Sequence, residues 1–136
     1  MTPTLYCLMR QDLQDLNPGK GMAQAMHAQA DFDQWVDDKL MSAPGYGAYI
    51  AEWKEDRSFG RTLVLECTLE QISNIASLTL GTNHPLGVTV DPAYPWRNFY
   101  GNKVFLTSEV TCAWVFVCDM TPPEVVEEIR KLSLDG

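Results

Sequence analysis

The chain has 136 residues, of which 46% are hydrophobic and 21% are charged, a size and composition typical of one globular domain. It contains no apolar run near the roughly 18 residues that span a membrane, and it does not open with the basic and apolar segments of a signal peptide, so we expect a cytoplasmic protein. The formal net charge of -8 argues against a nucleic-acid partner unless basic residues gather locally, because affinity for phosphate comes from lysine and arginine.

The N-terminal part of the chain predicts a strand followed by a helix. Residues 4–10 are a short apolar run that predicts a strand. After a polar loop, Asn17 as N-cap and Pro18 at the first helical position predict a helix over about residues 18–31. Residues 31–42 keep a helical apolar spacing, and they either continue this helix or begin a second one.

The rest of the chain alternates strands with helices. The predicted strands cover residues 61–68, 86–90 and 110–119, and the predicted helices cover residues 69–81 and 121–134. Thr68 and Thr121 are placed to cap these two helices. Residues 43–60, rich in glycine and aromatics, are predicted to be irregular with at most a helical turn near 48–54, and residues 91–109 are predicted to be largely loop. Strands alternating with helices indicate a sheet with helices on its faces.

The four cysteines, Cys7, Cys67, Cys112 and Cys118, all lie in apolar stretches. None belongs to a Cys-x-x-Cys pair and none is close in sequence to a histidine, so we expect no zinc site. We interpret them as small buried hydrophobic side chains in a reducing compartment.

One face of the first predicted helix is polar. Lys20, Gln24 and His27 are spaced by four and three residues, and at ~100° per residue they fall within roughly 60° of arc, together with Asp31. A lysine in the first turn opposes the helix dipole and is favoured where an anion lies nearby, whereas the alternative is a lysine exposed to water. Histidine can move protons and glutamine can position water or a carbonyl group, so the arc is either a solvated surface or one wall of a cleft.

Two later positions and one loop are further candidates. Asp91 follows the 86–90 strand, where α/β proteins often place functional groups, although an aspartate before proline also forms turns. Thr111 lies at the start of the last predicted strand. The aromatics and cations mixed in one loop are Trp96, Arg97, Phe99, Tyr100 and Lys103. Such a mixture suits single-stranded nucleic acid, and it is equally typical of a partly packed loop.

The segments LMRQDL and GKGMAQAMHA resemble the first strand and helix of the type 2 peptidyl-tRNA hydrolases. In that family a strand ends in R-x-D-L and a G-K-x-x-A-Q-x-x-H-A helix follows. The matching positions here are Arg10, Asp12, Leu13, Gly19, Lys20, Ala23, Gln24, His27 and Ala28. Elsewhere the similarity is looser: Asp91 takes the place of the family's aspartate, Thr111 matches a threonine of its last strand, and the D-A-G-R-T segment is replaced by D-P-A-Y-P.

The resemblance implies a single domain over residues 1–136 with an α/β fold, a four-stranded mixed β-sheet with helices on both faces in the order β-α-(α)-β-α-β-β-α. It implies hydrolysis of the ester that joins a peptide, or an N-blocked amino acid, to tRNA. In this interpretation Lys20 stabilises negative charge, His27 and Asp91 handle protons, and Gln24 and Thr111 orient water or substrate. The residues expected to bind the substrate are Arg10, Asp12, Arg97 and Lys103.

The resemblance requires no metal or cofactor, names peptidyl-tRNA as partner, involves no membrane and leaves a homodimer open. Two alternatives stay beside it. A relative that has lost catalysis would only bind tRNA or a protein, which the altered D-P-A-Y-P segment and the acidic charge favour. An unrelated interaction module would use the aromatic loops as its partner surface.

Overall fold

The computed structural model describes residues 1–13, 18–56, 60–97 and 104–134. In chain order the elements are β1 (Thr4–Arg10), α1 (Pro18–Lys39), the short 3₁₀ helix η1 (Leu40–Ser42), α2 (Tyr46–Glu55), β2 (Thr62–Cys67), α3 (Leu69–Ser77), β3 (Leu86–Arg97), β4 (Val104–Val117), α4 (Pro123–Arg130) and β5 (Ser133–Leu134). Within these residues, no helix combines the length and the apolar character needed to cross a membrane.

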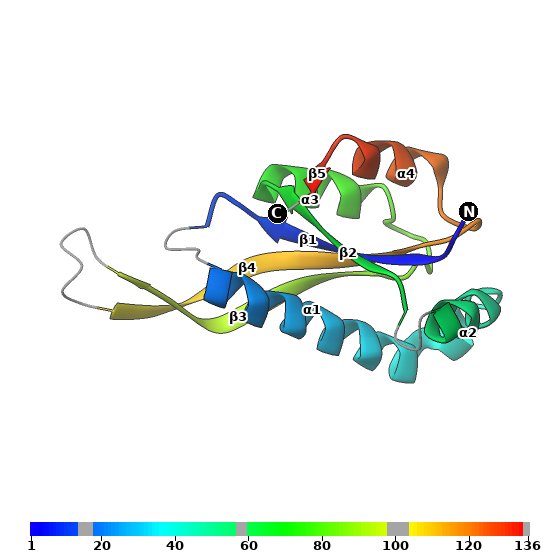
Figure 1. Ribbon diagram of the computed structural model, residues 1–136, viewed down its shortest axis with the longest axis horizontal. Coiled ribbons are helices and arrows are strands. Elements are labelled where there is room, and N and C mark those ends of the chain that lie inside the picture. Colours follow the sequence, from blue (N-terminus) through cyan, green and yellow to red (C-terminus); the bar gives the residue numbers. More distant parts are fainter. Residues whose placement is uncertain (14–17, 57–59, 98–103, 135–136) are drawn as a thin grey trace.

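The strands form one mixed sheet in the order β3-β4-β1-β2-β5 (Figure 1). β1 and β2 run parallel, and the other neighbouring pairs are antiparallel. The prediction of an α/β fold with a mixed sheet between helices is confirmed, and the two-residue β5 adds a short edge to the four predicted strands. β3 and β4 extend beyond the other strands as a two-stranded ribbon (Figure 1).

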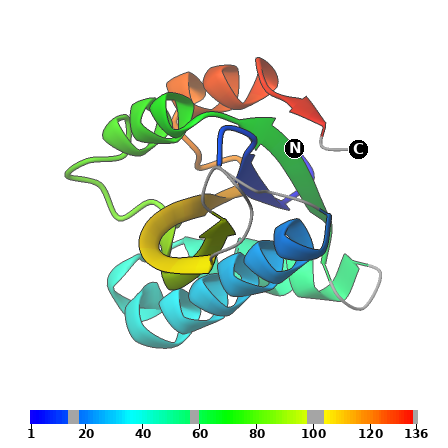
Figure 2. The same cartoon turned by 90° about the vertical axis from the view of Figure 1, so that its left-hand side faces the viewer.

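Each face of the sheet is covered by its own pair of helices, α1 and α2 on one side and α3 and α4 on the other (Figure 2). Side chains alternate between the two faces along a strand, so β1 and β4 supply both cores. The core under α1 and α2 is aromatic, with the Phe32 ring 5.3 Å from that of Trp53 and 5.2 Å from that of Trp114. The core under α3 and α4 is mainly aliphatic and includes Leu8 and Val115.

The predicted helices are confirmed in position but not in every bound. α1 is continuous to Lys39, and α2 forms a full helix where only one turn is predicted. The N-cap of α3 is Thr68 as predicted, paired with Gln71 in a capping box. The prediction for α4 is wrong at both ends: its N-cap is Pro122, while the Thr121 hydroxyl accepts a hydrogen bond from the Cys118 amide, and the helix ends at Arg130, before the strand β5. The predicted end of α3 near residue 81 is also wrong, because the helix ends at Ser77. Asn17 lies outside the described residues.

The prediction of a loop over residues 91–109 is wrong, because β3 and β4 pair from Leu86 through Arg97. Pro92 and Pro95 suggest a loop since proline lacks the amide hydrogen that a central strand needs. β3, however, is the edge strand of the sheet, where proline is tolerated. The residues after Asp91 therefore belong to a paired strand rather than an irregular loop, and the base of the ribbon lies beside the first turns of α1 (Figure 1).

Gly60 and Gly81 both have positive φ, at 84° and 77°, and they differ in their surroundings. A methyl group at Gly60 would overlap the Trp53 ring. A methyl group at Gly81 would have no described atom within 4 Å beyond its own chain neighbours. We expect Gly60→Ala to lower the free energy of unfolding by about 3 kcal/mol and Gly81→Ala, the matched control for backbone strain, by about 1 kcal/mol. Urea denaturation measures both, and equal losses would contradict a cost from the Trp53 contact.

Candidate active site

The candidate site forms where the first turns of α1 pack against β3 at the base of the ribbon (Figure 1). Asp91 and Tyr94 are three residues apart, yet they pair with β4 residues that are two apart, so β3 holds one extra residue here. Such a bulge changes which face of the sheet the following side chains occupy. As a result Asp91 and Tyr94 both contact α1, although strict alternation would send them to opposite faces.

The proline in this bulge is compensated locally. Pro92 has no amide hydrogen to donate, and the Ala93 amide donates to Asp91 Oδ1 at 2.9 Å instead of joining the ladder. The aspartate side chain therefore closes a turn over the proline. The D-P-A-Y-P segment thus holds one oxygen of Asp91 in place and leaves the other for α1.

Gln24 of α1 meets that second oxygen. Its Nε2 donates to Asp91 Oδ2 at 2.9 Å, and the glutamine side chain is only 3% exposed. Partial burial raises the pKa of Asp91, but the hydrogen bonds from Gln24 and Ala93 and the nearby His27 outweigh it, so the pKa lies below its ordinary value of 3.8. The carboxylate is therefore ionised at neutral pH.

Lys20 lies one turn before Gln24, against the same strand. Its Nζ donates to the Pro95 carbonyl at 3.0 Å and lies 5.4 Å from the ring centroid of Tyr94, which is 1% exposed. A lysine ammonium group over an aromatic face is attracted by the ring's quadrupole. The contact places a positive charge at the N-terminal end of α1, close to the bulge in β3.

A cleft of about 200 Å³ lies between α1 and β3, beside the Gln24–Asp91 contact. The residues that line it are His27, Ala30, Asp31, Thr89, Val90, Asp91 and Pro92. His27 is exposed on the helix side and Asp91 is partly buried on the strand side. An imidazole and two carboxylates thus line one solvent-accessible cleft, with the Gln24 amide bonded to one of these carboxylates, a set suited to acid–base chemistry on a polar substrate.

Thr111 does not line this cleft. It is the extra residue of a second irregularity, since Thr89 pairs with Cys112 and Val90 with Val110. Its side chain is fully buried, and its hydroxyl donates to Cys112 Sγ at 3.7 Å. The structure therefore places it near the site in the sheet but within the core.

Arg10 and Asp12 lie on the other face of the sheet. Arg10 Nε donates to Asp12 Oδ1 at 2.9 Å, and Arg10 Nη1 donates to the Val110 carbonyl at 2.8 Å. Asp12 Oδ2 accepts from the amide of Leu69, the first residue of α3. The pair connects β1, β4 and α3, and it is not brought together with Lys20, Gln24, His27 and Asp91.

The remaining expected substrate contacts are Arg97 and Lys103. Only the backbone of Arg97 is described, where it pairs with Val104. Lys103, Phe99 and Tyr100 lie outside the described residues, so their predicted roles stay predictions.

Two residues of the site were missed by the sequence interpretation. Thr89 lies two positions before Asp91, and strand alternation alone would place both on one face. Tyr94 has no such signal, because the bulge between it and Asp91 interrupts the alternation.

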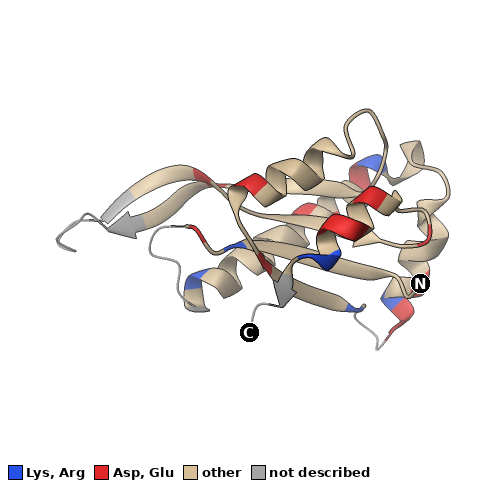
Figure 3. Cartoon of the chain, turned by 90° about the horizontal axis from the view of Figure 1, so that it is seen from above, with Lys and Arg blue, Asp and Glu red and all other residues tan. Residues whose placement is uncertain are grey.

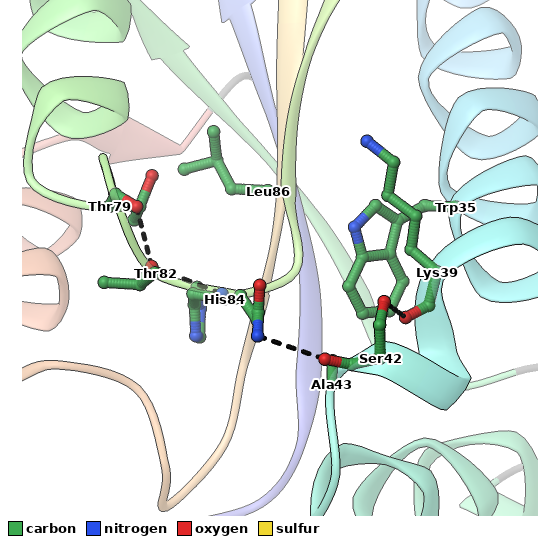
Figure 4. Close-up of a pocket in the computed structure, with 9 residues that line it drawn as sticks. Trp35, Lys39, Ser42, Ala43, Thr79, Thr82, His84 and Leu86 are labelled. Atoms are coloured by element: carbon green, nitrogen blue, oxygen red, sulfur yellow. Dashed lines mark hydrogen bonds between the residues drawn. The ribbon is translucent and has the colours of Figure 1, made fainter.

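A second pocket of about 200 Å³ lies near the C-terminal end of α1, lined by Trp35 and Lys39 among others (Figure 4). His84, which also lines it, is 2.9 Å from the Tyr46 hydroxyl through Nδ1, and burial lowers its pKa to about 4. It is neutral at pH 7 and links α2 to the segment before β3. We interpret this histidine as a structural contact between two elements.

Removing the Asp91 carboxylate should destabilise the protein through Gln24. In Asp91→Ala the buried Gln24 amide loses its acceptor, which we expect to cost about 1–3 kcal/mol in unfolding free energy. Asp91→Asn keeps an acceptor oxygen and should cost less. Asp31→Ala, which removes an exposed carboxylate from the same cleft, is the control and should change stability by less than about 0.5 kcal/mol. Chemical denaturation compares the three, and equal stability of Asp91→Ala and the wild type would contradict the contact.

The Arg10–Asp12 pair should show in the acid dependence of stability. The hydrogen bond from Arg10, opposed by desolvation and aided by the Leu69 amide, lowers the pKa of Asp12 below 3.8. A lowered pKa in the folded state stabilises the protein fully above 3.8, and this contribution is lost as the pH falls through the folded-state pKa. We expect Asp12→Asn to flatten the loss of stability below pH 3.8, with a cost at pH 7 near 1 kcal/mol at most because Asp12 is 40% exposed. Identical slopes for variant and wild type would disprove the linkage.

Comparison with protein-family models gives no match, and comparison with curated proteins gives none either. The resemblance to type 2 peptidyl-tRNA hydrolases therefore depends on the motif residues of β1 and α1. What these residues do has to be argued from the side chains around the cleft.

Proposed function

We propose that the chain hydrolyses the ester that links a peptide, or an N-blocked amino acid, to the ribose of tRNA. The observation that carries the proposal is the contact of Gln24 with Asp91 beside a cleft that His27 also lines, while Lys20, on the same face of α1, bonds Pro95 further along β3. These are the residues on which the resemblance depends, together with the aspartate that it expects opposite them. A cytoplasmic location is part of this proposal.

The proposed reaction needs an activated water and a group that stabilises the negative charge of the tetrahedral intermediate. The Asp91 carboxylate is ionised and held by two hydrogen bonds, and His27 stands across the cleft from it. Either group can accept the proton of the water. The hydrogen bond to Pro95 holds the Lys20 ammonium group at the base of the ribbon, where its charge would stabilise an oxyanion or a tRNA phosphate.

The charge distribution supports approach of tRNA from the side of α1 and β3. Acidic residues, red in Figure 3, include one at the start of α3 and three on α4, whereas the first turn of α1 carries a lysine. Residues 18–30 of α1 contain no acidic residue, and the four aspartates of this helix all follow them. A polyanion is therefore repelled least at the end of α1 where Lys20 lies.

A second candidate function is binding of tRNA or a protein without hydrolysis. It is favoured by the contact between Lys20 and the carbonyl of Pro95, a residue of the altered D-P-A-Y-P segment. This contact uses one of the lysine's donors inside the protein. Binding without turnover is the result that this candidate predicts.

Release of a labelled N-blocked amino acid from tRNA tests the proposal. We expect Lys20→Ala to lower turnover roughly 100-fold or more, and His27→Ala to lower it by about 100-fold, because each removes a charge-stabilising or proton-transferring group. A fall in kcat would assign Lys20 to the oxyanion, and a rise in KM alone would assign it to phosphate binding.

Lys39→Ala is the matched control, since it removes an exposed lysine from the last position of the same helix. It should retain wild-type turnover, and circular dichroism should show all three variants folded. Wild-type turnover in Lys20→Ala would contradict the proposed site. A wild type that binds tRNA but does not hydrolyse the ester would establish the second candidate.

A further inference from the structure

Two buried polar atoms at the candidate site have no hydrogen-bond partner among the described residues: Gln24 Oε1 and Thr89 Oγ1. Both side chains are 3% exposed. Buried polar groups in folded proteins are almost always hydrogen-bonded, because an unmade bond costs free energy. Two such atoms on facing elements therefore indicate a position that binds a further hydrogen-bonding group.

The two atoms belong to one small region. Gln24 Nε2 donates to the Asp91 carboxylate, which can only accept, so the orientation of the amide is chemically determined and Oε1 is the remaining acceptor. Thr89 lies two residues before Asp91 and lines the same cleft. Cys112, the strand partner of Thr89, donates through its thiol to the backbone carbonyl of Gln24 at 3.4 Å. Gln24, Thr89 and Asp91 thus converge from α1 and β3.

The strand itself does not require a hydroxyl at position 89. Valine has nearly the shape of threonine and an equally high preference for strands. The thiol of Cys112 lies beside the Thr89 hydroxyl, but a thiol is a weak hydrogen-bonding group. The buried hydroxyl therefore lowers the free energy of unfolding without a compensating strong hydrogen bond, which is typical of a functional position.

We propose that the Thr89 hydroxyl and the Gln24 amide oxygen together bind the attacking water of the ester hydrolysis, beside the Asp91 carboxylate. This inference rests on the proposed function. The water donates one hydrogen bond to Gln24 Oε1, and its oxygen accepts a hydrogen bond from the Thr89 hydroxyl. The second proton of the water is then directed at Asp91 or His27. The oxygen attacks the ester carbonyl, that proton passes to the base, the bond from the carbonyl carbon to the ribose oxygen breaks, and the ribose oxygen takes the proton.

Thr89→Val and Thr89→Ser test the role of the hydroxyl. We expect Thr89→Val to lower kcat roughly 10- to 100-fold with little change in KM, since it removes a group that positions only the water. Its unfolding midpoint should be unchanged or higher, because a buried unpaired hydroxyl is replaced by a methyl group. Thr89→Ser, which keeps the hydroxyl, should stay within about 3-fold of wild-type kcat.

Thr4→Val is the matched control. Thr4 is equally buried in β1, but its hydroxyl donates to the Thr2 carbonyl at 3.0 Å. This variant should keep wild-type turnover and lose stability, the opposite of Thr89→Val. The contrast separates a functional hydroxyl from a structural one.

Each other outcome overturns the inference. An unchanged kcat in Thr89→Val, in an active wild type, would remove Thr89 from the reaction and leave the proposed function standing. A loss of activity in Thr89→Val that comes with a lower unfolding midpoint and is not restored in Thr89→Ser would make Thr89 structural. A wild type without turnover would overturn the proposed function and this inference together.

Discussion

The hydrogen bond between Gln24 and Asp91 joins α1 to the edge strand of the sheet, across 67 residues of sequence. It depends on the bulge after Asp91, which lets the aspartate bond the amide beyond Pro92 with one oxygen and Gln24 with the other. The same contact brings His27 to the cleft and Lys20 to the base of the ribbon. The packing of α1 against β3 therefore also assembles the candidate site.

The two faces of the sheet differ in how their polar side chains are hydrogen-bonded. On the face under α1, polar groups surround a cleft and two buried oxygens have no partner among the described residues. On the face under α3 and α4, Arg10 is satisfied by Asp12 and Val110, and Asp12 in turn accepts from the first amide of α3. Among the described residues, the polar groups near Gln24 are thus less completely hydrogen-bonded than the Arg10–Asp12 pair on the opposite face.

Charge sets how a polyanionic substrate would meet this acidic molecule. The acidic residues of α1 lie in its second half, and those of α4 lie on the opposite side of the sheet. The first half of α1 carries Lys20 and the positive end of the helix dipole, which both favour anions. The overall charge of -8 disfavours nucleic acid, so the proposed tRNA substrate depends on the local absence of acidic residues in the first half of α1.

What the sequence determined by itself is local. Helical spacing placed Lys20, Gln24 and His27 on one face, the Thr68–Gln71 pair set the start of α3, and the alternation of strands and helices predicted the layered fold. Only the tertiary structure decided the rest. A proline predicts a loop unless its strand is known to lie at the edge of a sheet. A bulge, in turn, is defined only by the pairing with a partner strand, so its effect on side-chain direction cannot be predicted from one segment. Strand pairing places Thr89 and Tyr94 at the candidate site, and it places Arg10 on the opposite face of the sheet. Pairing depends on two segments at once, so no single segment encodes it.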